Sequence, residues 1–191
     1  MLKIQVIIGS TREGRFGDKP AKWIASYLKE KEDVEVELID LRDWPLPFFN
    51  EPVSPASSDG KYTNELAAKW AEKIGEADGY IIVTPEYNHG YPSVLKNALD
   101  YVYKQWNKKP VSFLSYGGMS GGTRAVQQLR QVVIELQLVP IRQSIHIPFF
   151  RKQLDESGNL KPDTLISQAD PMIEQLMWFA NLLKSGRGKN S

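Results

Sequence analysis

Short apolar runs alternate along the chain with segments in which apolar residues recur every three to four positions. The runs predict buried β-strands, and the periodic segments predict amphipathic helices. The predicted strands are Leu2–Ile8, Val34–Ile39, Tyr80–Val83, Val111–Ser115 and a weaker one near Val139–Ile145. The predicted helices are Asp18–Lys31, Thr63–Glu76, Pro92–Gln105 and Gly121–Gln137. This repeated strand-then-helix order predicts an α/β fold, a three-layer sandwich around a five-stranded parallel sheet.

The C-terminal segment carries one more helical pattern. From Thr164 the sequence predicts a short turn and then a new helix, with Asp170 as its N-cap and Pro171 at its first position. We expect Ser185–Ser191 to be disordered. Because no linker or repeat interrupts the chain, we expect residues 1–184 to form a single domain.

Two predicted connections are long for a compact domain. Arg42–Tyr62 carries several prolines and aromatic residues, which predicts a packed flap. Phe149–Lys161 is polar and predicts a surface excursion to which the sequence assigns no function.

Composition limits the possible partners. The chain has 191 residues and a formal net charge of +1, which argues against a broad surface for nucleic acid or anionic membrane. It contains no cysteine, so disulfides, thiol catalysis and thiolate metal sites are excluded. No apolar stretch is long enough to cross a membrane, and the chain begins with a strand and not with a signal peptide. We therefore expect a cytoplasmic protein in which any anion site is local.

The first predicted strand runs directly into the loop Gly9-Ser10-Thr11-Arg12-Glu13-Gly14-Arg15-Phe16-Gly17. Small residues, hydroxyl groups and the start of the next helix suit a phosphate, and an arginine adds a planar fork of donors. The glycine spacing matches neither the triphosphate-binding loop nor the dinucleotide fingerprint. Taken alone, the loop is equally compatible with an ordinary strand-to-helix turn that carries solvated arginines.

Two later strands also end in loops of unusual composition. Thr84–Pro92 combines prolines and aromatic rings with carboxylate, amide and imidazole groups. Tyr116–Thr123 contains four glycines, which expose backbone donors and allow close approach of a flat ligand. In a parallel sheet, all three loops lie at the carboxyl ends of strands, where open α/β folds bind ligands. The sequence therefore predicts one ligand site built from three loops.

Several segments carry a resemblance to a known family. They are Gly9-Ser10-Thr11-Arg12, Leu46-Pro47-Phe48-Phe49-Asn50-Glu51, Pro85-Glu86-Tyr87-Asn88, Pro92-Ser93-Val94-Leu95-Lys96-Asn97-Ala98-Leu99-Asp100, and Tyr116-Gly117-Gly118 with Gly121-Gly122. Together they resemble the NADPH-dependent FMN reductase family, which has the flavodoxin-like fold and includes quinone, azo-dye and chromate reductases. The resemblance runs from the first strand to about Ile145, and Pro85–Asn88 with the helix after it is its specific part.

The resemblance implies a position for each part of FMN. It implies that Ser10, Arg12 and the backbone around Arg15, Phe16 and Gly17 hold the phosphate. It places the isoalloxazine between two groups, which are Pro85, Glu86, Tyr87 and Asn88 on one side and Tyr116, Gly117 and Gly118 on the other. Many family members have a hydroxyl residue in place of Arg15, so here the expected phosphate contact is the Arg15 backbone N–H. For Glu86, we expect the backbone N–H to contact flavin more readily than the carboxylate, and the alternative is that Glu86 only caps the following helix or faces solvent.

The resemblance implies an NAD(P)H-dependent, FMN-containing oxidoreductase that passes hydride by way of flavin N5 to a quinone, azo compound, free flavin or similar acceptor. Because the cofactor carries the chemistry, we expect no catalytic side chain. We expect no metal site either, since His89 and His146, the two histidines, lack metal-ligand spacing. Arg15, Lys19 and Arg151 are candidates for contacting the 2′-phosphate of NADPH.

The family also implies a homodimer or homotetramer. Two alternative functions stay open from the sequence. One is a flavodoxin-type one-electron carrier, and the other is a non-catalytic flavin or nucleotide sensor in which the Arg42–Tyr62 flap reports occupancy.

Overall fold

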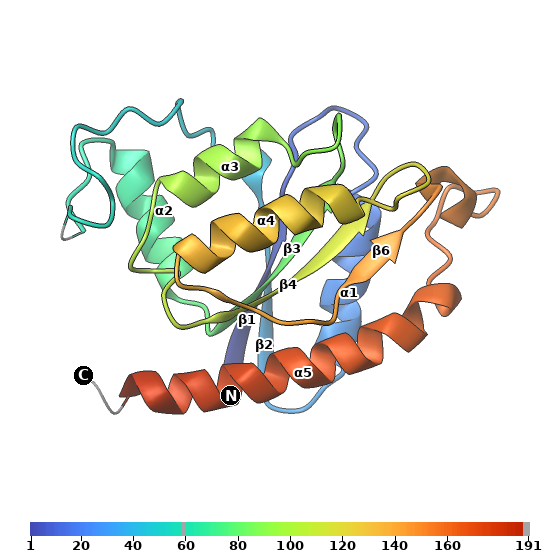
Figure 1. Ribbon diagram of the computed structural model, residues 1–191. Helices are drawn as coiled ribbons and strands as arrows, with labels where there is room; N and C mark the ends of the chain where they lie inside the picture. Colours follow the sequence, from blue (N-terminus) through green and yellow to red (C-terminus); the bar gives the residue numbers. More distant parts are fainter. Residues whose placement is uncertain (59, 189–191) are drawn as a thin grey trace.

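The strands form one parallel sheet (Figure 1). The computed structural model describes residues 1–58 and 60–188. The strands are β1 (Leu2–Ile8), β2 (Val34–Asp40), β3 (Gly79–Pro85), β4 (Pro110–Tyr116), β5 (Val139–Pro140) and β6 (Ile145–Ile147). They follow the order β2-β1-β3-β4-β5, β6 also pairs with β4, and every strand pairing is parallel. This is the flavodoxin-like order, so the predicted fold class is confirmed.

The predicted fifth strand is present as two short strands, β5 and β6. The backbone N–H groups of Val139 and Ile141 donate to carbonyls around the start of β4 at 2.9 and 3.0 Å, so the pairing passes Pro140 and then ends. In the gap, Arg130 donates to the carbonyl of Ile141 at 2.7 Å and to that of Arg142 at 3.1 Å. Pairing with β4 resumes in β6, which brings Ile147 beside Tyr116 at the carboxyl edge of the sheet.

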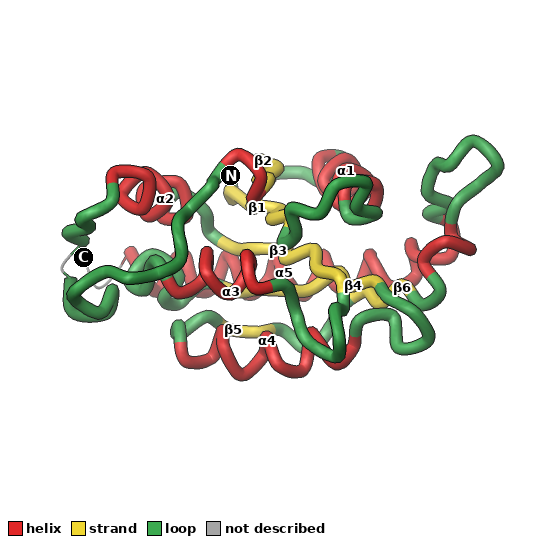
Figure 2. Tube along the Cα trace, turned by 90° about the horizontal axis from the view of Figure 1, so that it is seen from above, coloured by secondary structure: helices red, strands yellow, loops and turns green. Residues whose placement is uncertain are grey.

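Helices cover both faces of the sheet (Figure 2). The helices are α1 (Asp18–Lys29), α2 (Glu65–Gly75), α3 (Ser93–Asp100), α4 (Thr123–Glu135) and α5 (Asp163–Gly188), with 3₁₀ turns η1 (Leu41–Asp43) and η2 (Phe150–Gln153). One core cluster joins α1 and α5 to the sheet, and a second joins α2, α3 and α4 to it. Strands β3 and β4 are buried at every residue. That is why they appear in the sequence as uninterrupted apolar runs.

Helix α3 is shorter than the predicted Pro92–Gln105, because it ends at Asp100. The indole N–H of the fully buried Trp106 donates to the carbonyl of Leu99 at 3.2 Å, so a side chain satisfies an acceptor at the helix end. The neighbouring Trp70 likewise donates to the carbonyl of Ala98 at 2.8 Å. These two rings fill the core beneath the end of α3 and turn the chain toward β4.

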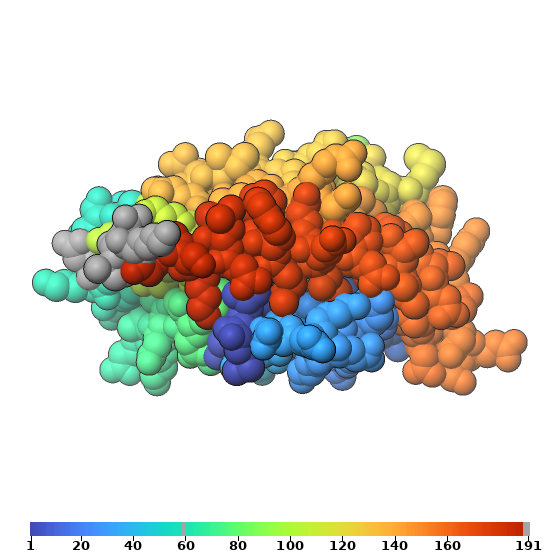
Figure 3. Space-filling model, turned by 90° about the horizontal axis from the view of Figure 1, so that it is seen from below, coloured from blue at the N-terminus to red at the C-terminus, as the bar shows by residue number. Residues whose placement is uncertain are grey.

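Helix α5 differs most from the sequence prediction, because Pro171 lies inside one continuous helix and does not begin a new one. Figures 1 and 3 show this helix running along the length of the molecule. Apolar residues before and after the proline, including Ala169 and Met172, are fully buried against the sheet. Their packing outweighs the hydrogen bond that the proline removes. Asp170, predicted as the N-cap, instead accepts a hydrogen bond from the Tyr27 hydroxyl at 2.8 Å.

The C-terminal residues were predicted to be disordered from Ser185, and this is wrong as far as Gly188, the last residue of α5. Arg187 explains the difference, because its guanidinium donates to Asp78 at 2.8 Å and to the carbonyl of Lys108 at 2.7 Å. Residues 189–191 lie outside the described residues. Within residues 1–58 and 60–188, no helix combines the length and the apolar character needed to cross a membrane.

The continuous α5 makes a prediction about Pro171. Replacing it with alanine (Pro171→Ala) restores a backbone donor inside the helix and removes the clash with the preceding turn. We expect the free energy of unfolding in urea to rise by about 1–3 kcal/mol. Glu174→Ala, one turn further along, is the matched control and should change it by less than about 0.5 kcal/mol. A Pro171→Ala variant that is less stable than the parent would contradict this account of the helix.

Candidate functional site

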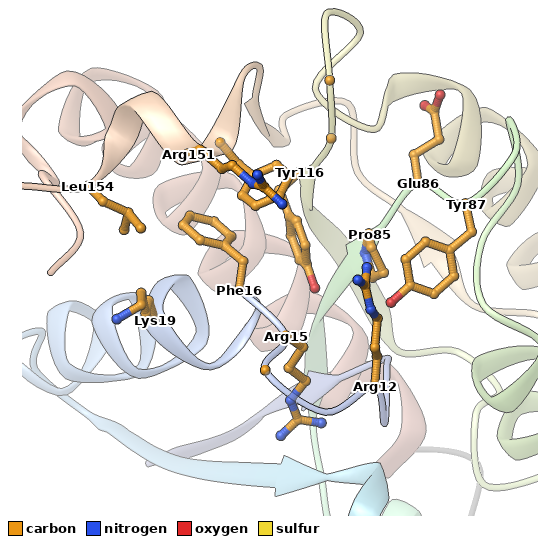
Figure 4. A pocket seen from close by; sticks show the side chains of 14 residues that line it. Arg12, Arg15, Phe16, Lys19, Pro85, Glu86, Tyr87, Tyr116, Arg151 and Leu154 are labelled. Atoms are coloured by element: carbon orange, nitrogen blue, oxygen red, sulfur yellow. The ribbon is translucent and has the colours of Figure 1, made fainter. Parts of the chain in front are cut away.

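The carboxyl ends of β1, β3 and β4 surround a cavity of about 520 Å³ (Figure 4). This volume lies in the range of roughly 300–1,000 Å³ that small-molecule sites occupy. The lining residues come from the three predicted loops and from the segment after β6: Arg12, Gly14, Arg15, Phe16, Lys19, Pro85, Glu86, Tyr87, Tyr116, Gly117, Gly118, Phe150, Arg151 and Leu154. Most of the predicted cofactor-contacting residues are therefore brought together. Ser10, Gly17 and Asn88 lie outside this lining.

The first loop presents unpaired backbone donors toward the cavity. Its start is fixed to the sheet by the Gly9 N–H, which donates to the carbonyl of Val83 at 2.8 Å. Within the described part of the chain, the backbone N–H groups of Thr11, Arg12 and Gly14 have no acceptor. Helix α1 begins directly after this loop, so the positive end of its dipole adds to the donors.

The side chain of Arg12 extends from this loop toward the other wall of the cavity. Figure 4 shows its guanidinium beside Pro85 and Tyr87. The residue is exposed, and among the described residues no carboxylate pairs with it. Its planar group is available to an anionic ligand.

Arg15 differs from Arg12, because its guanidinium is turned away from the cavity and is almost fully buried, with 1% of the side chain exposed. It donates to both carboxylate oxygens of Asp40, to Asp18 at 2.6 Å and to the carbonyl of Ser10. Its backbone N–H, the expected phosphate contact, instead donates to the carbonyl of Arg12 at 3.3 Å. Both sets of donors on Arg15 therefore have partners that shape the loop, and contact of Arg15 with a phosphate stays a prediction.

Asp40 is the partner that sets this arrangement. Burial raises the pKa of Asp40, but hydrogen bonds from Arg15 and from the Arg42 backbone outweigh it, and the pKa falls below its usual value. Asp40 thus remains a carboxylate at neutral pH. Arg42 also holds the first loop, because its guanidinium donates to the backbone carbonyls of Thr11 and Arg12.

The second loop is a tight turn beyond β3. Tyr87 and Gly90 exchange backbone hydrogen bonds of 2.8 and 2.9 Å, and Asn88 and His89 between them have φ angles of 48° and 70°. Two consecutive positive φ values define a type I′ turn, which asparagine tolerates better than most residues. The turn leaves Pro85 and Tyr87 on the cavity wall and carries Asn88 outside it.

Glu86 links the second loop to the third and does not offer its polar groups to a ligand. Its backbone N–H donates to the carbonyl of Tyr116 at 3.1 Å, and the flavin contact expected of this group stays a prediction. Its carboxylate, which points away from the cavity in Figure 4, accepts from Arg124 Nε at 2.7 Å and from Ser120 Oγ at 3.0 Å. It also accepts from the Arg124 backbone at 3.2 Å, so the carboxylate caps α4 and not the helix that follows it in the chain, α3, as the alternative had it.

The third loop presents a flat, uncluttered surface. A Cβ placed on Gly118 would meet no atom within 4 Å, so the glycine leaves open space on the cavity side. The N–H of Gly117 donates to the carbonyl of Ile147 at 3.2 Å, whereas the N–H of Gly118 has no acceptor within the described residues. The loop therefore contributes a backbone donor beside a surface that a planar ring could approach.

Tyr116 reaches from the third loop to the first. Its hydroxyl lies 3.5 Å from Ser10 Oγ, and a Cβ at position 17 would lie 2.8 Å from it, so only glycine fits there. Burial raises the pKa of Tyr116 to about 12. The phenol therefore stays protonated at neutral pH and can donate a hydrogen bond.

The segment after β6 contributes three lining residues, of which only Arg151 had a role predicted from the sequence. Phe150 packs against Phe16 with ring centroids 4.9 Å apart and against Tyr116 at 5.7 Å. This contact brings Arg151 and Leu154 to the cavity. The signal in the sequence is the aromatic pair Phe149-Phe150, followed by the cations Arg151 and Lys152. Aromatic residues in an otherwise polar segment indicate that part of it packs against the core.

The donor set fits FMN, because a phosphate can take the free N–H groups and Arg12 while a planar ring lies against Pro85 and Gly118. A family model described as NADPH-dependent FMN reductase matches residues 2–152. The chain belongs to this family.

Individual relatives agree with this family. An NAD(P)H-dependent FMN reductase of Schizosaccharomyces pombe is 41% identical over 148 residues, which span 76% of this chain and 74% of the yeast protein. A 2-hydroxy-1,4-benzoquinone reductase of a Burkholderia species is 32% identical over 166 residues, spanning 83% and 85%. An FMN-dependent NADPH-azoreductase of Staphylococcus aureus is 30% identical over 183 residues, spanning 94% and 96%. Membership of a family of flavin-dependent oxidoreductases is thereby confirmed.

A solved structure has the same fold as this chain. FerB, an NAD(P)H:(acceptor) oxidoreductase from Paracoccus denitrificans, superposes with a TM-score of 0.71 and covers 97% of this chain and 98% of its own. Its sequence identity of 20% makes this a likeness of fold.

The buried ion pair of Arg15 predicts a large loss of stability when its partner is removed. Asp40→Asn removes the bidentate carboxylate partner of the buried guanidinium and leaves it with Asp18, which is 34% exposed. We expect the free energy of unfolding in urea at pH 7 to fall by about 3 kcal/mol. Asp43→Asn, at an exposed acid in the same 3₁₀ turn, is the matched control and should change it by less than about 0.5 kcal/mol. Equal effects of the two substitutions would show that the pair does not hold the loop.

The pair between Glu86 and Arg124 predicts a pH dependence. Burial raises the pKa of Glu86, but hydrogen bonds from Arg124 and Ser120 outweigh it, so the folded-state pKa is lowered. The pair therefore stabilises the fold above the unfolded pKa of about 4.3, and this contribution is lost as the pH falls through the lowered folded value. Glu86→Gln should thus be less stable than the parent by about 1–2 kcal/mol at pH 7. Urea unfolding at pH 7, 5 and 3.5 should show the two proteins converging at the lowest pH, and a constant difference would refute the assignment.

Proposed function

We propose that this family member is an NAD(P)H-dependent, FMN-containing oxidoreductase that reduces a small-molecule acceptor such as a quinone, azo compound or free flavin. The observation that carries the proposal is the meeting of free phosphate-type donors and a flat, glycine-lined wall in one cavity at the carboxyl edge of the sheet. The proposal takes residues 1–184 as a single FMN-binding domain.

The first loop would hold the phosphate of FMN. The free N–H groups of Thr11, Arg12 and Gly14 and the N-terminus of α1 provide donors, and the Arg12 guanidinium adds a charge-assisted contact. Ser10 and Tyr116 contribute hydroxyl groups that lie 3.5 Å apart at the base of the same loop.

The second and third loops would hold the isoalloxazine. Pro85 and Tyr87 form one wall, and Gly118 leaves space for a ring on the other. The Gly118 N–H supplies a donor that can stabilise negative charge on a bound ring. FMN, when bound, supplies the hydride chemistry of the reaction.

Among the described lining residues, no carboxylate is free to act as an acid or base in the reaction. Glu86 is the only carboxylic acid among the described lining residues, and its carboxylate is taken by Arg124 and Ser120. The side chains would therefore act by placing the cofactor and the nicotinamide face to face and by excluding water. For this reason the proposal assigns no catalytic side chain.

The relatives named for quinones and azo compounds support a flat organic acceptor for this chain as well. The proposal also includes a homodimer or homotetramer, because Ile134 on α4 and Met119 before it are 61% and 80% exposed and such apolar groups suit an interface between subunits. It includes a cytoplasmic location, since a chain without cysteine is suited to a reducing compartment.

The decisive experiment measures cofactor binding and turnover together. We expect the purified protein to bind FMN with a flavin absorption spectrum and to oxidise NADPH or NADH when a benzoquinone is added. Arg12→Ala should weaken FMN binding by roughly 10–100-fold, because one charge-assisted phosphate contact is lost, while riboflavin binding, which lacks the phosphate, should stay unchanged. Arg142→Ala, at an exposed arginine outside the cavity, is the matched control.

Three other outcomes would each contradict a different part of the proposal. Failure to bind FMN in calorimetry would overturn the whole function. Bound FMN without nicotinamide oxidation would favour a one-electron carrier. Unchanged FMN affinity in Arg12→Ala would overturn the phosphate role of Arg12.

A further inference from the structure

The cavity continues past the proposed FMN site along helix α1. A second hollow of about 560 Å³ shares Gly14, Arg15 and Lys19 with the first and ends at Asn159 and Leu160. The two hollows form one path, which runs from Pro85 and Tyr87 past Lys19 to the segment after β6. The proposed FMN contacts involve only the first part of this path.

Three cations line the combined hollow where its two parts meet: Lys19 of α1 lines both parts, Lys22 of α1 lines the second, and Arg151 of η2 lines the first. None of them has a carboxylate partner within the described residues. The one acid in this lining, Asp18, is already paired with Arg15 at 2.6 Å and with Arg42 at 3.8 Å. A chain with a net charge of only +1 thus concentrates unneutralised positive charge at one hollow.

The segment after β6, residues 150–160, forms the wall opposite α1 and is fixed by its own contacts. Leu154 and Leu160 form an antiparallel bridge, and the turn between them is closed by Asn159, whose backbone N–H donates to Asp155 at 2.7 Å. Phe150 anchors the start of this segment against Phe16 at 4.9 Å. Figure 4 shows Lys19 and Arg151 on opposite sides of Phe16, with Leu154 beside them. The hollow therefore combines two opposed cations with apolar surface, the pattern that suits a phosphorylated nucleoside.

We propose that the combined hollow binds the adenosine 2′-phosphate end of NADPH where its two parts meet, with Lys19 and Arg151 as the phosphate ligands that select NADPH over NADH. The inference rests on the proposed function, which puts the nicotinamide near Pro85 and Gly118 at the other end of the path. Arg15, the third candidate from the sequence, is excluded because its guanidinium is buried against Asp40 and Asp18. The wall residues Leu154 and Leu160 offer the apolar surface for the adenine base.

The test measures binding of two probes to the FMN-loaded protein by calorimetry. Adenosine 2′,5′-bisphosphate carries the 2′-phosphate, and 5′-AMP lacks it. We expect the parent protein to bind the bisphosphate more tightly, and Lys19→Ala and Arg151→Ala each to weaken it by roughly tenfold, as for the loss of one exposed charge-assisted contact. Binding of 5′-AMP should change by less than about twofold. Lys152→Ala, at the cation next to Arg151 that lines neither hollow, should leave both probes unaffected.

Turnover supplies the second readout. In Lys19→Ala and Arg151→Ala, kcat/KM for NADPH should fall by roughly tenfold while kcat/KM for NADH and the affinity for FMN stay at the parent values. Equal binding of the two probes by the parent protein, or equal losses for NADPH and NADH in the variants, would overturn the subsite. NADH-driven turnover and FMN binding that persist in that case would leave the proposed function standing, so the two failures are distinguishable.

Discussion

The buried ion pair between Arg15 and Asp40 is the interaction on which the site depends. The first loop leaves several backbone donors without protein partners, and such a loop would collapse onto itself or stay disordered if nothing held it open. The guanidinium binds the loop from the inside through the carbonyl of Ser10 and fixes it to β2 through Asp40 and to α1 through Asp18. Removing the charge from water is costly, but each donor group finds an oxygen, so the loop is fixed with its free donors facing outward.

A second charged pair holds the other two loops in the same way. Glu86 belongs to the loop after β3, and its carboxylate binds Ser120 and Arg124 beyond β4. Both pairs direct their charges away from the cavity, so apart from Arg12 the surface near the proposed ring site is backbone, proline and tyrosine. Such walls recognise a ligand by shape and stacking more than by directed side-chain hydrogen bonds. A site of this kind accepts many flat acceptors, which agrees with the range of relatives in the family.

The sequence predicted the sheet and the three loops because both follow from local pattern. Buried parallel strands are short apolar runs, and the residues that interrupt them mark the carboxyl edge. The direction of a side chain does not follow from local pattern. Arg12 and Arg15 have similar neighbours, and only Asp40, which lies on another strand, decides that the second of them turns inward. Pro171 was misjudged for the same reason, because the packing of α5 on a distant sheet decides whether the helix continues.

The placement of positive charge separates small substrates from protein partners. An electron carrier that docks on another protein uses charges spread over a face, because steering depends on the field of the whole surface. Here the unpaired cations Arg12, Lys19 and Arg151 line a hollow whose volume suits a small molecule, and the chain as a whole is close to neutral. Charge confined to a cavity acts on a ligand that enters it, and most strongly on one that carries phosphate. The same arrangement therefore favours diffusible nucleotides on both sides of the proposed flavin, one held as cofactor and one exchanged as co-substrate.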